Sequence, residues 1–425
     1  MQANKVVFLL FFWIVGVTAA IGQATRSPFS SLGVGDRFDN SLAHNQGMAG
    51  VSISNPQYWY LNNNNPALLV YNYYTVLGAG FIGERRTAQS EGVPSEKNGG
   101  GNLNYLAMAF PIKSGKWSAA VGLMPYSNVN YKIFYQQNIT GSTNTVDVIE
   151  TGSGGINQAY FSNGFRLYKN LSAGVKFVYL FSSIEQEFKN SLTSTGQSIP
   201  IISGVREITY FRDINFSGGL AYHLDSLGKK QNNHLNFGLT YELKSKIHTE
   251  FTQQARRYTA SGDLADSLTI SRLGGNTDIP QSIAGGISYG RPGFWMIGAD
   301  VTYQDYSALR DFRGRGRNGA PSWRYALGLE VTPNPAALGS YLKRVTYRTG
   351  VSYEELPYSI NGSTIQDFGI NFGFSMPVGR FSSLDLGGKV GTRGDLQTTV
   401  IKENYFKVYF GVTFNDQWFI KRKFD

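Results

Sequence analysis

Few residues in this chain have types and spacing that could do chemistry. Residues Gly286 to Gly290 spell GISYG and match the G-x-S-x-G turn that exposes a nucleophilic serine in many hydrolases. That turn needs a strand, a sharp bend and then a helix, whereas this motif lies in a Gly-rich strand pattern that leads into another strand pattern. We therefore expect no catalytic residues and no enzymatic activity.

The histidines are the candidate metal ligands, and there are four of them: His44, His223, His234 and His248. None of them forms an i, i+4 pair, and the chain has no cysteine. The sequence therefore predicts no metal site and no cofactor. His223 shares a strand face with Ala221 and Asp225, and we expect it to be a polar lining residue.

An arginine cluster lies among glycines in LRDFRGRGRNG, residues 309–319. Planar guanidinium groups bind phosphates in bidentate geometry, so an extracellular loop of this kind suits lipopolysaccharide. RNA binding and a solvated loop without a partner are the alternatives. The arginines of this basic loop are Arg310, Arg313, Arg315 and Arg317.

The N-terminus predicts export. Lys5 precedes an apolar run from Val6 to Val17, and small residues follow up to Gly22, so residues 1–22 have the pattern of a signal peptide with the mature chain starting at Gln23. Export disfavours nucleic acid as the partner of a chain with net charge +10 and favours anionic outer-leaflet lipid. A basic balance kept only for solubility is the alternative.

The composition indicates many strands with little solvated surface. Charged residues make up 16% and aromatic residues 14% of the chain, and 50 of its 425 residues are glycine. No second apolar stretch is long enough for a transmembrane helix, which excludes a helical membrane protein.

From residue 72 onward, apolar and polar residues alternate at period two. In residues 405–414 the apolar face carries Phe406, Val408, Phe410, Val412 and Phe414. The opposite face carries Tyr405, Lys407, Tyr409 and Thr413. We count about fourteen such segments, an even number typical of bacterial outer-membrane barrels. A soluble β-sandwich is the alternative, with its apolar face as the core.

The connections between these segments alternate between long and short. Stretches expected to be long loops are 83–100, 131–155, 189–204, 251–278 and 307–320. Short periplasmic turns and longer extracellular loops produce this parity. The sequence therefore predicts an all-β protein, a transmembrane antiparallel β-barrel of about 14 strands formed by residues 72–425, with a short periplasmic C-terminal tail.

Residues 23–71 do not alternate and contain the run Asn62, Asn63, Asn64 and Asn65, followed by Pro66 and Ala67. Pro66 favours an extended Asn65 and a turn. Because a barrel of this size encloses more space than its own side chains fill, we expect residues 23–71 to be an N-terminal hatch or plug in the lumen. A periplasmic tether is the alternative.

The chain resembles the outer-membrane long-chain fatty-acid transporters of the FadL/TodX type. The resemblance rests on Asn65-Pro66-Ala67 before the first strand, on IPQSIAGGISY at 279–289, and on the strand count and export signal. It implies a monomeric 14-stranded barrel in the outer membrane of a Gram-negative bacterium, with a lumenal hatch. It further implies that a hydrophobic small-molecule ligand binds between hatch and wall and leaves sideways at a kinked third strand.

The predicted third strand, 116–130, contains a proline that fits this picture. Pro125 donates no ladder hydrogen bond, so together with Gly122 it predicts a break in strand pairing. We assign the lateral opening to Gly122, Pro125 and Tyr126. An ordinary bulge near the strand end is the alternative.

The C-terminal tail NDQWFIKRKFD resembles divergent Bacteroidota members of this family, some of which are thought to plug or partner larger translocons. A second functional hypothesis is therefore a non-transporting barrel that plugs or scaffolds a larger outer-membrane secretion assembly.

Overall fold

The computed structural model describes residues 24–142, 144–194, 197–228, 232–259, 261–307, 310, 313, 319–360, 362–378 and 382–416. The expected signal peptide and the tail after Asp416 lie outside these residues. No helix in the described part of the chain is long and apolar enough to cross a membrane.

Short elements come first in the chain, and long strands follow. The first four elements are the 3-10 helix η2 (Pro28–Ser31), the strand β1 (Asp36–Arg37), the helix α2 (Ala43–Gln46) and the 3-10 helix η3 (Pro66–Tyr71). The strands of the wall are β2 (Thr75–Ser90), β3 (Val93–Lys113), β4 (Trp117–Asn138), β5 (Thr145–Arg166), β6 (Leu171–Ser194), β7 (Gln197–Leu227), β8 (Asn233–Glu242), β9 (Ser245–Tyr258), β10 (Leu264–Ile279), β11 (Ser282–Arg291), β12 (Trp295–Asp305), β13 (Pro321–Val331), β14 (Thr346–Ile360), β15 (Ser363–Val378), β16 (Ser382–Arg393) and β17 (Ile401–Asp416).

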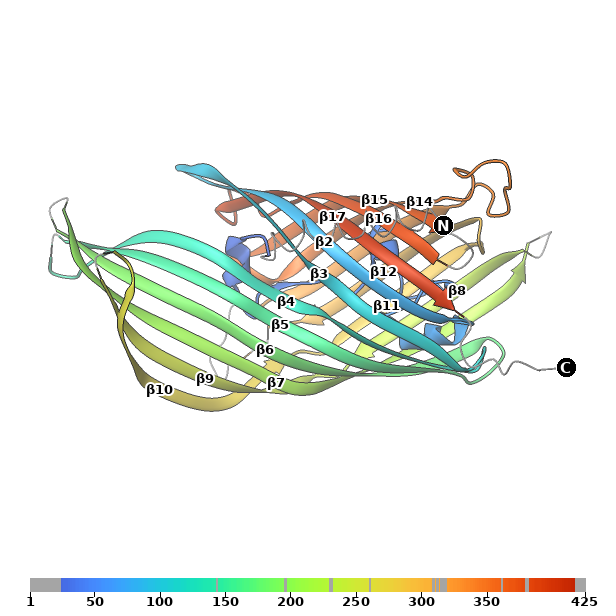
Figure 1. Ribbon diagram of the computed structural model, residues 1–425, viewed down its shortest axis with the longest axis horizontal. Coiled ribbons are helices and arrows are strands. Elements are labelled where there is room, and N and C mark those ends of the chain that lie inside the picture. The colour runs from blue at the N-terminus through green and yellow to red at the C-terminus, as the bar shows by residue number, and fades with distance from the viewer. Residues whose placement is uncertain are drawn as a thin grey trace, which may run out of the picture.

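The wall strands pair antiparallel around a closed ring (Figure 1). β7 pairs with β8 along one part of its length and with β9 along the other, so β8 and β9 form one interrupted strand. β10 and β11 likewise form one interrupted strand, because β10 pairs with β9 and β11 pairs with β8. Counted this way, the described residues form a 14-stranded barrel, which confirms the predicted fold and excludes a β-sandwich.

The two faces of each strand differ as the period-two pattern predicts. In β15, Phe368, Ile370 and Phe372 are 42–51% exposed, whereas Asp367 and Asn371 are 3% and 1% exposed. An outward apolar face and an inward polar face are what a barrel in a bilayer needs, since closure leaves no unpaired edge in lipid. One residue of the outward face is an exception: Val412 of β17 is buried.

The predicted long loops are mostly strand. Residues 83–100 continue β2 and β3 up to a turn at Glu91 and Gly92, and 131–155, 189–204 and 251–278 also belong largely to paired strands. The prediction was wrong because hairpins keep their ladder hydrogen bonds beyond the apolar band, where alternation in sequence is no longer required. In Figure 1, β4 to β7, β9 and β10 project past the other strands at the left of the view. We call this end of the barrel the long-strand end. The opposite end, where β3 joins β4 and β5 joins β6, we call the short-turn end.

Residues 24–72, hereafter the plug, lie inside the ring of strands (Figure 1). All four of its elements contact the wall: η2 packs on β4, β1 pairs with β4, η3 packs on β4 to β7, and α2 packs on β15 to β17. Most of its side chains are buried, including Met48, Val51 and Leu69 at 0% exposed. A chain segment therefore fills much of the lumen.

Candidate functional site

The wall has a gap between β3 and β4. The two strands pair from Lys113 and Trp117 as far as Leu106 and Leu123, and no further. Beyond that point β3 continues along β2 and β4 continues along β5, so within the described residues the two strands are unpaired toward the long-strand end. The pairing stops two residues before Pro125.

The three residues assigned to a lateral opening have different roles at this gap. Pro125 has no N–H to donate, and a register shift between Pro125 and Ser127 makes Tyr126 a bulge in the β4–β5 ladder. Gly122 lies in the paired region, where a Cβ would come within 2.5 Å of the Tyr160 ring. Gly122 therefore makes room for Tyr160 and does not itself break the ladder.

The plug covers the edge of β4 that β3 leaves unpaired. The Phe38 amide donates to the Tyr126 carbonyl at 3.0 Å, and the Ser27 amide donates to the Asn130 carbonyl at 2.8 Å. Between these two contacts, β1 pairs with the two residues that follow Tyr126. An uncovered strand edge in a bilayer would leave backbone groups without partners. The gap is closed here by the plug, in the place where the wall would need another strand.

Ion pairs fix the plug beside the gap. Asp36 of β1 accepts from Arg86 at 3.3 Å and from Arg393 at 2.9 Å. Arg86 is 2% exposed and also pairs with Glu403 at 2.5 Å and Glu84 at 2.6 Å. Burial works against the charged carboxylate, but Arg393 and Arg86 hold the pKa of Asp36 well below its usual value. The Asp36 carboxylate thus joins the plug to two strands of the wall, β2 and β16, and Arg86 extends the network to Glu403 of β17.

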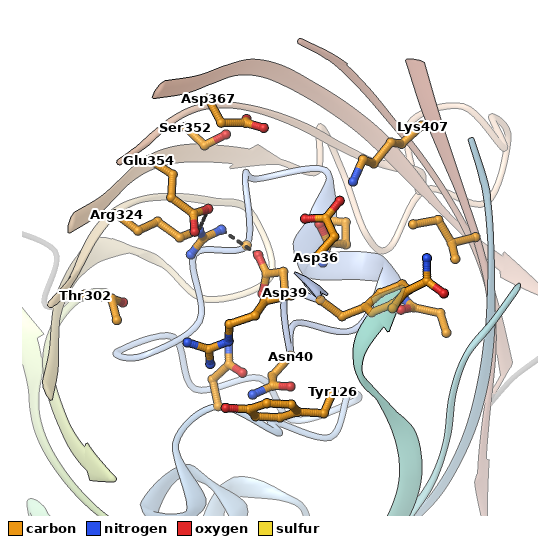
Figure 2. Close-up of a pocket in the computed structure, with 18 of the residues that line it drawn as sticks. Asp36, Asp39, Asn40, Tyr126, Thr302, Arg324, Ser352, Glu354, Asp367 and Lys407 are labelled. Carbon is orange, nitrogen blue, oxygen red and sulfur yellow. Dashed lines mark hydrogen bonds and ion pairs between the residues drawn. The ribbon is translucent and has the colours of Figure 1, made fainter. Parts of the chain in front are cut away.

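A second anchor lies across the lumen. Asp39 accepts from Arg324 of β13 at 2.5 Å, and the same guanidinium donates to the Ala49 carbonyl at 2.8 Å (Figure 2). Arg37 donates to the Tyr306 hydroxyl at 2.7 Å and also to Gln304. Guanidinium groups on both the plug and the wall therefore hold the two together.

The space between these anchors is a cavity of about 270 Å³. Figure 2 shows the charged side chains that line it, among them Asp36, Asp39, Arg324, Glu354, Asp367 and Lys407. Sites for apolar ligands are lined mainly by hydrophobic and aromatic side chains, so this lining does not suit an alkyl chain. Apolar surface lies closer to the gap, where buried Tyr105, Met124, Tyr126 and Val129 form a cluster against which Phe38 packs.

The asparagine run ties the plug together from within. Asn62 accepts from the Asn65 amide at 2.9 Å, and Asn64 donates to the Ser41 and Ser52 hydroxyls at 2.8 and 2.7 Å. Asn65 caps η3, because its Oδ1 accepts from the Ala67 amide at 3.0 Å. Most of these partners are in the plug itself. The asparagine side chains therefore mainly stabilise the conformation of the plug and make fewer contacts with the wall.

Two of the asparagines also reach the wall. Asn63 accepts from Lys176 of β6 at 2.9 Å, and Asn65 donates to the Leu220 carbonyl of β7 at 3.0 Å. Pro66 begins η3, and both Pro66 and Ala67 are buried. Asn65-Pro66-Ala67 therefore turns the chain inside the lumen just before β2.

Wall glycines form sockets for the plug backbone. A Cβ on Gly174 would lie 2.4 Å from the Pro66 carbonyl carbon, one on Gly219 would lie 2.2 Å from Asn65 Oδ1, and one on Gly238 would lie 2.0 Å from the Ile53 carbonyl oxygen. These glycines sit on the inner face of neighbouring strands. Their small size lets the plug approach the wall closely.

We expect Gly238→Ala to loosen the plug, because the added methyl overlaps the Ile53 carbonyl and overpacking costs about 1–3 kcal/mol. Limited proteolysis of the folded barrel should then cut within residues 24–72 faster than in the parent protein. Gly285→Ala is the matched control, since a Cβ there meets nothing within 4 Å. Equal cleavage of the two variants would mean that the socket does not hold the plug.

The G-x-S-x-G serine lies within a strand, as the strand pattern on both sides of the motif predicts. Ser288 of β11 is 1% exposed, accepts from Asn236 at 3.0 Å and donates to the Ser54 carbonyl at 3.0 Å. Among the described residues, its hydroxyl bonds to Asn236 and Ser54 and not to a histidine.

Of the basic loop, Arg310 and Arg313 are described, whereas Arg315 and Arg317 lie outside the described residues. The Arg310 carbonyl accepts from the Asp278 amide at 3.3 Å, and the Arg313 guanidinium lies 4.3 Å from the centroid of the Phe251 ring. Arg313 therefore packs on β9 at the long-strand end.

A second cavity, of about 570 Å³, lies at the short-turn end. Aromatic and proline side chains supply much of its lining, including Tyr58, Trp59, Tyr60, Pro292 and Trp295. The β7–β8 hairpin brings His223 and His234 together on its rim, with ring centroids 5.0 Å apart. This pair does not have the i, i+4 spacing that marks a metal site on a helix, so the sequence pattern did not predict it. An antiparallel hairpin instead joins residues whose separation depends on the length of the turn.

A closed 14-stranded barrel with an apolar outer face and a lumenal plug defines an outer-membrane-type barrel with the FadL-like fold. Within that class, the chain belongs to the BamG family, whose profile matches residues 1–425.

Solved structures share the fold at low sequence identity. The chain is similar to a CymD monoaromatic hydrocarbon channel, at 14% identity over 89% of this chain and 98% of that one, with a TM-score of 0.56. It is also similar to the P. putida toluene transporter TodX, at 14% identity over 89% and 99%, with a TM-score of 0.56. A Pseudomonas aeruginosa FadL homologue gives 12% identity over 89% and 99%, with a TM-score of 0.59. No curated protein matches the chain.

Proposed function

We propose that the protein is an outer-membrane passive transporter for hydrophobic molecules, long-chain fatty acids or compounds of similar character, and that they leave sideways through the β3–β4 gap. One observation carries the proposal: the β3–β4 ladder stops at Leu106 and Leu123, and the edge of β4 beyond it is covered by residues 27–38 of the plug. Passage then requires only a local movement of this segment, while the rest of the plug stays seated. Structural neighbours described as a monoaromatic hydrocarbon channel and a toluene transporter support this proposal.

The apolar cluster beside the gap is the proposed binding surface. Phe38 of the plug and Tyr126 and Val129 of β4 meet there, close to the unpaired edge. Burial of alkyl groups is worth about 0.8 kcal/mol per CH₂, so binding needs no energy coupling. The charged cavity deeper in the lumen is not part of this route.

We expect Pro125→Val to lower uptake several-fold. Valine restores a backbone donor and a strand-forming residue where the ladder now breaks, which favours pairing across the gap. Uptake of a labelled fatty acid by vesicles containing the purified barrel measures the effect. Pro111→Val is the matched control, because Pro111 lies in the paired part of β3, opposite Ser118. Unchanged uptake in Pro125→Val would refute the route.

The second candidate is a non-transporting barrel that plugs or scaffolds a larger outer-membrane assembly. The ion-paired plug and the charged cavity favour it, because both suit a sealed lumen better than a conduit. Membership of the BamG family, rather than of a family named for transport, also favours the scaffold candidate.

Purification in mild detergent separates the two candidates. A stoichiometric large partner supports the scaffold, and a monomer that carries co-purified lipid supports the transporter.

We further propose that the protein resides in the outer membrane of a Gram-negative bacterium of Bacteroidota type, that it is not an enzyme, and that its short-turn end is periplasmic. The basic loop then faces outward at the long-strand end. Its arginines suit the phosphates of lipopolysaccharide, and nucleic acid is not a partner.

A further inference from the structure

Three groups able to ligate a metal converge at the short-turn end of the barrel. His223 and Asp225 of β7 and His234 of β8 place one ligand atom each within 4.8 Å of one another. Nδ1 of His234 lies 3.0 Å from Oδ1 of Asp225 and 3.1 Å from Nε2 of His223. Oδ1 of Asp225 also contacts Nε2 of His223.

The hairpin geometry produces this convergence. The β7–β8 register shifts between Leu224 and Leu227, and Ser226 has a left-handed φ of 64°. Such a bulge changes the direction of the neighbouring side chain. Here it leaves Asp225 beside both imidazole rings.

A chain of hydrogen bonds from the plug fixes the tautomer of His223. The Ser54 carbonyl can only accept, so the Ser288 hydroxyl donates to it at 3.0 Å and must accept from the Asn236 amide, also at 3.0 Å. The Oδ1 of Asn236 then faces Nδ1 of His223 and accepts a hydrogen bond from its N–H. In the neutral imidazole, Nε2 of His223 therefore presents a lone pair toward Asp225 and His234.

Lone pairs on a carboxylate and on an imidazole nitrogen repel one another unless a proton or a metal cation lies between them, and two imidazoles beside one carboxylate can hold either. Ligand atoms held at about 2.0–2.2 Å from one tetrahedral Zn²⁺ are about 3.3–3.6 Å apart. The two separations given above are slightly shorter than this, and the closer contact of Asp225 with His223 must open when an ion binds, which the exposed Asp225 side chain allows. Two imidazoles with one carboxylate suit zinc and neighbouring first-row ions, and an outer hydrogen bond to the second ring nitrogen is typical of metal-bound histidine.

We propose that His223, His234 and Asp225 form a binding site for one divalent transition-metal ion, best fitted by Zn²⁺, on the rim of the short-turn cavity. The Asp225 side chain is 52% exposed, so an ion can enter from solvent, and the chain supplies three ligands, which leaves a position for water or for a group bound in the cavity.

The site also depends on the seated plug. Ser54 sets the tautomer of His223 through Ser288 and Asn236, and the Tyr71 ring packs edge-on against His223 with centroids 5.4 Å apart. Metal affinity would therefore depend on whether the plug is in place, although all three ligands belong to β7 and β8.

The test is a competition titration of Zn²⁺ against a chromophoric chelator, with the full-length barrel in detergent after chelation and dialysis. We expect one ion per chain, loss of binding in His223→Ala and in His234→Ala, and a roughly 10–100-fold weaker affinity in Ser288→Ala. His248→Ala is the matched control and should bind as the parent does, because His248 lies on β9 away from this site.

Heat-modifiable gel migration shows that each variant remains a folded barrel, and His223→Asn replaces His223→Ala if the alanine variant does not fold. X-ray absorption of the zinc-loaded protein should show only nitrogen and oxygen ligands. The proposal is overturned if the parent protein binds no stoichiometric zinc, or if both histidine variants bind as tightly as the parent. Unchanged affinity in Ser288→Ala would overturn the role given to the plug.

Discussion

Uptake of hydrophobic molecules is expected to fall to background when the plug is cross-linked to the edge of β4. Arg37 and Ser127 are paired neighbours in the β1–β4 ladder, and Cα atoms of such partners lie about 4.5–5.5 Å apart, within the range of a disulfide. The chain has no cysteine, so Arg37→Cys with Ser127→Cys introduces the only thiols. Under oxidising conditions the bond holds the gap shut.

The reversibility of this cross-link makes the experiment specific. Reduction should restore uptake to the level of the two single variants, which also report the cost of losing the Arg37 bonds to Gln304 and Tyr306. Vesicles with the oxidised and reduced protein are compared in the same assay. Full uptake by the oxidised, cross-linked barrel would show that the cargo does not pass the β3–β4 gap, and the scaffold candidate would then take its place.

The second large effect is expected from Asp36→Ala. Removing this carboxylate leaves Arg86 and Arg393 with fewer partners in a buried place, and breaking a buried ion pair typically costs about 3–5 kcal/mol. Because Asp36 lies in β1, the loss should appear first as release of the plug from β4. Faster proteolysis within residues 24–38, with the barrel still folded, is the measurement.

A surface ion pair provides the control for this variant. Lys244 and Asp278 are 3.2 Å apart with side chains 49% and 22% exposed, so Lys244→Ala should change stability by less than about 1 kcal/mol. If Asp36→Ala and Lys244→Ala behave alike, the buried ion pairs do not hold the plug.

The barrel could be predicted from the sequence because one physical rule governs every strand. Side chains alternate between the two faces, so Phe368 and Ile370 on one side and Asp367 and Asn371 on the other already indicate a wall between lipid and a polar interior. The length of the strands could not be predicted from this rule. Beyond the apolar band a hairpin needs only backbone hydrogen bonds, which any non-proline residue supplies.

The anchors of the plug were harder to predict. Asp36 and Asp39 sit in a segment without periodicity, and their partners are 50 or more residues away in the chain. A signal did exist, since Glu84 and Arg86 fall on one inward strand face, where buried charges require partners. The His223–His234 pair depended on the turn between β7 and β8, which the alternation pattern does not specify.

The central claim is that alternate residues of each strand face lipid while their neighbours face a plugged lumen. Single-cysteine variants along Phe368 to Phe374 of β15, labelled with a fluorophore and reconstituted in brominated lipid, test it directly. The account predicts strong quenching at positions 368, 370, 372 and 374 and none at positions 369, 371 and 373. Equal quenching along the strand, or quenching of the first set by a water-soluble reagent instead, would contradict it.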